Sequence, residues 1–255
     1  MDSTAVATPV WLPRLPSHER AFLKITESHI SDSPRFLLAP DTLDATYYEH
    51  EFPDWRILRF PTAHFSNTQT YSQWLTTPDF YKAWHPFEFL MICQTDAVVI
   101  KPPDMQQFRN VDYVGAPWSP PIRAVNVGDR LSIASRNGAW HGPWATRYLG
   151  RAIHVGNGGL SLRRVDKFIR FAENLQAPPF QRLTLRFQED ALFCCLGSRW
   201  DLQIAPLALA RETFMEKEAA QHRNIPSVCG FHALWNVNRA LAETVIGSFL
   251  PDHTQ

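Results

Sequence analysis

The chain of 255 residues is 45% hydrophobic and 20% charged, so it can bury a core and its composition excludes a disordered protein. Lys plus Arg and Asp plus Glu number 25 each, and this balance argues against a nucleic-acid-binding protein. No stretch approaches the roughly 20 apolar residues that cross a bilayer. Met1 to Thr8 has neither a basic start nor a long apolar core, which predicts no signal peptide and a cytoplasmic protein. The four cysteines form no CxxC pair, which favours reduced thiols over a zinc site.

The N-terminal part of the chain has the element order of an α/β protein. The pattern predicts a β-branched strand at 4–11 and a helix that begins at Ser17, with Ser17 as its N-cap. Two short buried strands follow at 35–39 and 55–60, each closed by a proline. This alternation of strands and a helix is typical of a βαβ layout.

The clearest strand is the apolar run 87–93, which is preceded by a helical pattern at 71–84 that Pro78 interrupts. A continuously apolar strand is expected where helices cover both faces of a sheet. A second apolar run follows at 97–100, after Asp96. Because open α/β sheets bind ligands at the carboxyl ends of their strands, Asp96 is a candidate site residue.

The C-terminal part predicts further elements within one domain that spans 1–255. Residues 119–147 are rich in Pro, Gly, Arg and Trp, which indicates a long loop or small insertion that closes over the site. The other predicted elements are a strand–glycine turn–strand at 153–162, helices at 165–175 and 188–196, a last strand at 204–208, and a loop and then a helix at 229–246. The C-terminal helix and tail together are assigned to 236–255.

Acidic residues supply two candidate catalytic positions. Asp96 suits a divalent metal that neutralises phosphate charge, although an Asp after a strand is more often a turn residue. Glu189 and Asp190 begin a helix, where a carboxylate that faces a cleft serves as a general base. A helix-capping pair is the structural alternative.

A glycine-rich segment supplies a third candidate, Gly156-Asn157-Gly158-Gly159, where the backbone can approach a ligand closely. A tight hairpin turn is the alternative. The pattern is not GxGxxG, and the chain has no GxxxxGK[ST] or GxSxG motif. Arg163-Arg164 follows, either as a phosphate contact or as a solvated face. His232 is either a metal ligand or a structural histidine.

The order of these motifs resembles a family of uncharacterised glycosyltransferase-like proteins, common in bacteria and catalogued as a domain of unknown function. The resemblance spans Thr4 to Trp235 and rests on PVW (9–11), QTD (94–96), DYVGAPW (112–118), VGNGGLSLRR (155–164), QEDALF (188–193) and CGFHALW (229–235). That family in turn resembles GT-A glycosyltransferases. The resemblance therefore implies a single Rossmann-like α/β domain with a central, mixed, mostly parallel sheet flanked by helices.

The resemblance also implies roles for individual residues. Asp190 would be the general base, with Glu189 as its neighbour or substitute. Asp96 would be the last acid of a DxD-type motif, and His232 would complete the metal site. The remaining donor-binding residues would be Pro9, Val10 and Trp11 at the nucleotide, Gln94, Asn157, Gly158, Gly159 and Arg163 at the diphosphate and sugar, and Trp118 and Trp235 as stacking platforms.

Gln94 departs from the DxD pattern, because an amide replaces its first acid. Asp96 and His232 can still hold Mn²⁺ or Mg²⁺, or Lys101, Arg163 or Arg164 can stabilise the diphosphate without metal; we favour the metal.

The resemblance thus predicts an inverting transferase that moves a sugar from a nucleotide-sugar, expected to be a UDP-sugar, to a glycan or glycolipid acceptor, with peripheral membrane association possible. Two alternatives are an inactive sugar- or nucleotide-binding module, which Gln94 favours, and an unrelated Rossmann-like enzyme, which the missing motifs disfavour.

Overall fold

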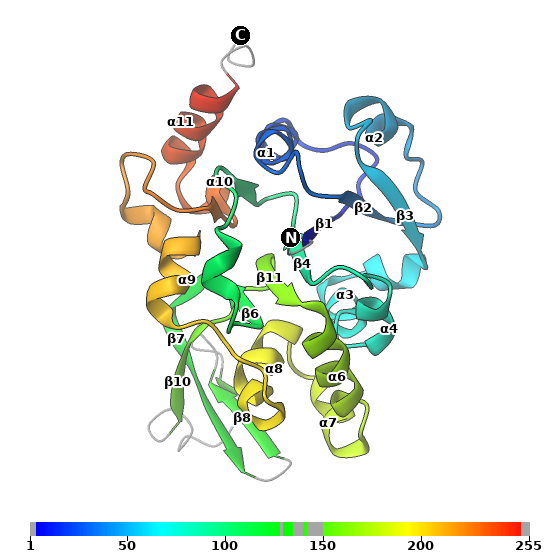
Figure 1. Cartoon of the computed structure of the whole chain (residues 1–255), viewed down its shortest axis with the longest axis vertical. Helices are drawn as coiled ribbons and strands as arrows, with labels where there is room; N and C mark the ends of the chain where they lie inside the picture. Colours follow the sequence, from blue (N-terminus) through cyan, green and yellow to red (C-terminus); the bar gives the residue numbers. More distant parts are fainter. Residues whose placement is uncertain (1–3, 128–129, 135–139, 142–149, 251–255) are drawn as a thin grey trace.

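A computed structural model describes residues 4–127, 130–134, 140–141 and 150–250 (Figure 1). Its central sheet has six strands in the order β3-β2-β1-β4-β11-β6. From one edge to the other these are β3 (Arg56–Phe60), β2 (Arg35–Pro40), β1 (Thr4–Pro9), β4 (Phe89–Cys93), β11 (Leu160–Arg164) and β6 (Tyr113–Gly115). The first four are parallel, and β11 runs antiparallel to both β4 and β6. The predicted mixed, mostly parallel sheet is therefore confirmed.

The apolar sequence of β4 explains its central place, since all five of its side chains are buried. It pairs with β1 on one side, with Ala7 opposite Ile92. On the other side β11 pairs with it so that Leu160 lies opposite Cys93. The segment before β11 therefore meets the segment after β4 at the carboxyl edge of the parallel strands.

Two smaller sheets flank the central one. The four-stranded antiparallel sheet contains β10 (Arg151–Val155), β7 (Pro117–Val127), β8 (Arg130–Ala134) and β9 (Trp140–His141), in that order. It lies at the lower end of the molecule in Figure 1, with α11 at the upper end. The three-stranded sheet contains β12 (Phe214–Met215), β13 (Gly230–Phe231) and β5 (Val98–Val99).

Helices cover the sheets as the α/β class requires. The described α-helices are α1 (Ser17–His29), α2 (Thr46–Glu51), α3 (Thr68–Trp74), α4 (Pro78–Lys82), α6 (Val165–Leu175), α7 (Pro178–Thr184), α8 (Glu189–Leu196), α9 (Leu207–Thr213), α10 (Leu234–Val237) and α11 (Arg239–Phe249). Short 3-10 turns form η1 (Thr62–Phe65), η2 (Met105–Phe108), η3 (Gly197–Trp200) and η4 (Lys217–Gln221). The predicted helix at 165–175 has the observed bounds because its buried residues recur at helical spacing.

Several sequence-based expectations were wrong. The described part of 119–147 belongs to β7, β8 and β9 rather than to a long loop; residues 128–129, 135–139 and 142–147 lie outside the described residues. The run 153–162 is not a hairpin, since β10 and β11 belong to different sheets. At 204–208, a single bridge between Tyr113 and Ile204 replaces the predicted strand, because α9 begins at Leu207. Ser17 is the first helical residue rather than the N-cap, a position held by Pro16.

Candidate functional site

Asp96 and His232 meet because two short strands pair. β5 begins two residues after Asp96, and β13 ends one residue before His232. The two strands are antiparallel with Phe231 opposite Val98, so their neighbouring ends carry the two side chains to the same place. His232 Nε2 lies 3.4 Å from Asp96 Oδ1 and 3.3 Å from Gln94 Oε1. The imidazole thus faces both polar residues that follow β4.

Gly159 lies directly beside this cluster. Its carbonyl accepts a 2.8 Å hydrogen bond from the backbone N–H of Gln94, as the pairing of β4 with β11 requires. A Cβ added at Gly159 would lie 2.2 Å from His232 Nε2 and 2.6 Å from Gln94 Oε1. Any side chain at position 159 would therefore displace the His232 imidazole from its observed position.

Gly158, the adjacent residue, lies beside the two acids at the start of α8. A Cβ there would meet Glu189 Oε1 at 2.6 Å and the Asp190 Cβ at 3.4 Å. The Glu189 amide donates to Ser72 Oγ at 2.7 Å, which fixes the beginning of α8 against α3. Asp190 is half-buried, and its Oδ1 accepts from the Ala191 amide at 2.6 Å. The structure therefore brings Asp96, His232, Glu189 and Asp190 together around the Gly158-Gly159 dipeptide.

Asn157 is held by contacts that the sequence does not indicate. Its Oδ1 accepts from the Gly159 amide at 2.9 Å, and its Nδ2 donates to Glu216 Oε2 at 3.0 Å. Asn157 and Glu216 are both buried. Sequence reasoning missed Glu216, which lies among other acids and has no distinguishing pattern. The side-chain amide of Asn157 thus donates to Glu216, and the side-chain oxygen of Asn157 accepts from the backbone of the glycine segment.

The two arginines after the glycine segment lie inside the protein rather than on a solvated face. Arg163 is fully buried, and its guanidinium contacts Gly158, Ser161 and Tyr81. Arg164 binds Asp112 at 3.0 Å and also Glu88, which closes the opposite edge of the central sheet. Lys101 is exposed, but it lies beyond the end of β5 that is remote from Asp96.

The two tryptophans predicted as stacking platforms are packed against protein groups. Trp118 is 5% exposed, and its ring fills the space where Gly156 lacks a side chain, 2.2 Å from an added Cβ. Trp235 stacks on His18 with ring centroids 4.4 Å apart, and the Arg239 guanidinium lies 4.7 Å from its ring centroid. The structure thus places neither ring beside Gly158-Gly159.

Trp11 instead presents an exposed ring, 49% of its surface being accessible. It follows Pro9, which ends β1, and Val10, which is buried. Its pocket of ≈ 330 Å³ is lined by Trp11, Phe65, Ser66, Asn67, Thr68, Tyr71 and Gln94. Burial raises the pKa of Tyr71 above its usual value, so its hydroxyl keeps its proton and remains a donor. Gln94 belongs both to this pocket and to the Asp96–His232 cluster, so the two adjoin at this residue.

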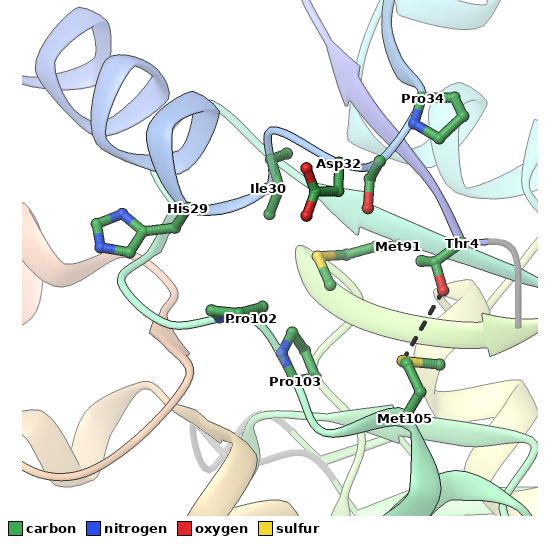
Figure 2. A pocket seen from close by; sticks show the side chains of 10 residues that line it. Thr4, His29, Ile30, Asp32, Pro34, Met91, Pro102, Pro103 and Met105 are labelled. Atoms are coloured by element: carbon green, nitrogen blue, oxygen red, sulfur yellow. Dashed lines mark hydrogen bonds between the residues drawn. The ribbon is translucent and has the colours of Figure 1, made fainter. Parts of the chain in front are cut away.

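A second pocket, of ≈ 490 Å³, lies at the other edge of the sheet (Figure 2). Its lining includes Thr4, the first residue of β1, and Pro34, directly before β2. Prolines and methionines supply much of the rest of its wall, with Met91 and Met105 facing the centre of the view in Figure 2. None of the predicted site residues lines this pocket.

Glycosyltransferases are among the solved structures that this fold resembles. The galactosyltransferase LgtC, in complex with donor and acceptor sugar analogues, matches with a TM-score of 0.53 and 11% identity over 96% of both chains. Mouse xyloside xylosyltransferase 1 matches with a TM-score of 0.52 and 7% identity, over 92% of this chain and 99% of the other. No curated protein matches the sequence significantly. The architecture is therefore the GT-A fold that the resemblance implied.

Residues 54–232 match the model of the family described as Protein of unknown function (DUF5672). The chain belongs to this family, which confirms the family resemblance seen in the sequence. In the described part of the chain, no helix combines the length and apolarity that a membrane span needs.

The atoms around His232 fit a divalent cation. Mg²⁺ binds ligands at 2.0–2.1 Å in octahedral geometry, so neighbouring ligand atoms lie about 3 Å apart. The separations of 3.3 and 3.4 Å from His232 Nε2 to the oxygens of Gln94 and Asp96 are close to that value. Within the described ranges, no group of three or more His, Cys, Asp or Glu side chains is arranged for a metal. A cation here would therefore depend on the Gln94 amide oxygen as its third protein ligand.

Proposed function

We propose that this protein is a nucleotide-sugar-dependent glycosyltransferase that inverts the anomeric carbon. The observation that carries this proposal is the convergence of two groups at Gly158-Gly159. The Gln94–Asp96–His232 cluster lies on one side, and the acids of α8 lie on the other. The exposed Trp11 ring lies in the adjoining pocket. A phosphate-binding cluster, a candidate base and an aromatic wall are thus contiguous at the carboxyl edge of the parallel strands, where open α/β sheets bind ligands.

The pocket between Trp11 and Tyr71 suits the nucleoside of the donor. An exposed Trp ring offers its face to a base, and Asn67 offers polar contacts. We propose UDP-sugars as the class of donor. Gln94 lines this pocket and also contacts His232, which supports a diphosphate bound next to Asp96 and His232.

Mn²⁺ or Mg²⁺ held by Asp96, His232 and Gln94 would neutralise charge on the departing diphosphate. Asp190 would accept the proton of an acceptor hydroxyl, whose oxygen then bonds to the anomeric carbon. The bond from that carbon to the diphosphate breaks, and the diphosphate leaves with the electron pair. The acceptor class is a hydroxyl of a glycan or glycolipid, by analogy with the fold.

The direct test of function is a panel of nucleotide-sugars, with and without Mn²⁺, in which release of free nucleotide is measured. A donor that is consumed faster in the presence of an acceptor glycan supports the proposal. Tight binding with no turnover of any donor supports an inactive module instead. Gln94 favours that alternative, because its amide leaves the motif with one carboxylate fewer than a DxD pair.

Asp96→Ala is expected to remove most of the Mn²⁺-dependent stabilisation by the donor. The substitution removes the proposed carboxylate ligand and leaves the imidazole of His232. A ligand at 100-fold above its Kd stabilises a protein by about 2.7 kcal/mol, so thermal-shift measurements can detect this loss. The matched control is Asp79→Ala, which removes an exposed acid of α4. An Mn²⁺-dependent shift that persists in Asp96→Ala would place the diphosphate elsewhere.

A further inference from the structure

The Arg163 guanidinium is the most deeply buried charged group beside the site, with 0% of its surface exposed. Its Nη2 donates to the Gly158 carbonyl at 3.1 Å, its Nε to Ser161 Oγ at 3.1 Å, and its Nη1 to the Tyr81 hydroxyl at 3.0 Å. The segment 158–161 and helix α4 therefore meet on one planar group. Such a planar fork matches several acceptors at once, which an ammonium group does not.

The same guanidinium fixes the backbone of Gly158 at the candidate sugar site. The Gly158 carbonyl accepts two hydrogen bonds, from Arg163 Nη2 and from Ser161 Oγ at 3.0 Å. Two donors on one carbonyl fix the orientation of the peptide that links Gly158 to Gly159. That peptide separates the acids of α8 from His232.

Glu189 is the counter-charge of Arg163. Glu189 Oε1 lies 3.6 Å from Arg163 Nη2, and the Glu189 side chain is 10% exposed. Among the described residues, no other carboxylate forms an ion pair with Arg163. Within the described part of the chain, removal of the Glu189 carboxylate would leave the buried guanidinium without an ionic partner, and an unpaired buried charge is strongly destabilising. Asp190, the next residue, is half-buried.

We propose that Arg163 is a positioning residue that holds the Gly158 peptide in place and engages Glu189 as its counter-ion, so that Asp190 rather than Glu189 acts as the base. This inference rests on the proposed transferase function. It divides the two neighbouring acids into an internal counter-ion and a base that faces the substrate. It also assigns Arg163 a role beneath the site rather than at the diphosphate.

A thermal double-mutant cycle tests the ion pair without any substrate. Glu189→Gln and Arg163→Met are each expected to lower the Tm by about 10 °C, because each leaves a buried charge unpaired. The double variant Arg163→Met/Glu189→Gln should lose clearly less than the sum of the two. Arg170→Met, which truncates an exposed arginine of α6, is the control and should change the Tm little. Strictly additive losses overturn the pairing.

Turnover tests the division of roles. At a temperature where Glu189→Gln is folded, it should lose much less turnover than Asp190→Asn and keep the pH dependence of kcat/KM that the wild type shows. Arg163→Lys keeps the charge but not the fork, so it should recover most of the Tm loss yet lower kcat with KM nearly unchanged.

Three results overturn the proposal. Glu189→Gln that is stable but as inactive as Asp190→Asn would make Glu189 the base. Arg163→Lys with wild-type kcat would remove the positioning role. Absence of turnover in the wild type overturns the proposed function, and the division of roles with it, whereas the thermal cycle still decides whether the ion pair exists.

Discussion

Asp190→Asn is expected to lower turnover of the donor by about 100-fold or more while donor affinity changes little, because the amide cannot accept a proton. The substitution keeps the size of the side chain, and the amide oxygen can still accept the 2.6 Å hydrogen bond from the Ala191 amide. Loss of kcat should therefore not arise from unfolding of α8. Steady-state kinetics with the donor identified in the panel, together with its Kd, separate the two quantities.

The matched control is Asp166→Asn. Asp166 occupies the second position of α6, as Asp190 does in α8, but it is exposed and follows the end of β11 that is remote from Gly159. Both substitutions remove a negative charge from the first turn of a helix, which costs about 0.3–1 kcal/mol. Only Asp190→Asn should lose activity. Equal rates for Asp190→Asn and the wild type would mean that the proton goes to another group.

Gly159→Ala is expected to abolish metal-dependent donor binding. The new methyl group would lie 2.2 Å from His232 Nε2 and 2.6 Å from Gln94 Oε1, so the imidazole must move away from Asp96. No positive φ is recorded at Gly159, and the backbone itself therefore tolerates Ala. The expected result is loss of the Mn²⁺-dependent thermal shift while the protein remains folded.

Gly247→Ala provides the control for a glycine substitution. Gly247 lies within α11, and a Cβ there meets nothing within 4 Å. Ala at this helical position should stabilise the protein by about 1 kcal/mol and leave donor binding unchanged. If Gly159→Ala binds donor and Mn²⁺ as the wild type does, the cluster around His232 is not the diphosphate site.

The elements that local sequence predicted well are those in which burial follows a simple period. Helix α6 buries Val165, Phe168 and Phe171 on one face, and this spacing is visible in the sequence. Strand β4 is a continuous apolar run whose position between β1 and β11 accounts for its composition. In both elements the pattern along the chain is sufficient to identify the structure.

Strand β7 was not predicted, because its proline residues suggest a loop. Pro120 and Pro121 lie where the pairing of β7 with β10 changes register, since Ile122 faces Ile153 but Pro117 faces Val155. A proline cannot donate to a ladder and is tolerated at such irregular points. The same residues that suggested a loop are thus compatible with a bent strand, and only the partner strand distinguishes the two.

The candidate site was predicted in part. Motif order indicated Asp96, Asp190 and His232, and the structure places them around one dipeptide. Glu216 and Ser72 were not predicted, because their contacts with Asn157 and Glu189 join segments 59 and 117 residues apart. The inward course of Arg163 was missed for the same reason, since its surroundings come from α4, α8 and β11 together.

The position of β1 limits how the chain can be divided. The family model matches 54–232, yet β1 and β2 precede that segment, and β1 lies between β2 and β4. A fragment restricted to 54–232 would leave one side of β4, a strand of five fully apolar residues, without a hydrogen-bonding neighbour. Exposed apolar strand edges pair with other chains, so such a fragment is expected to aggregate rather than fold. The segment that the family model matches is therefore shorter than the stretch of chain that the central sheet needs.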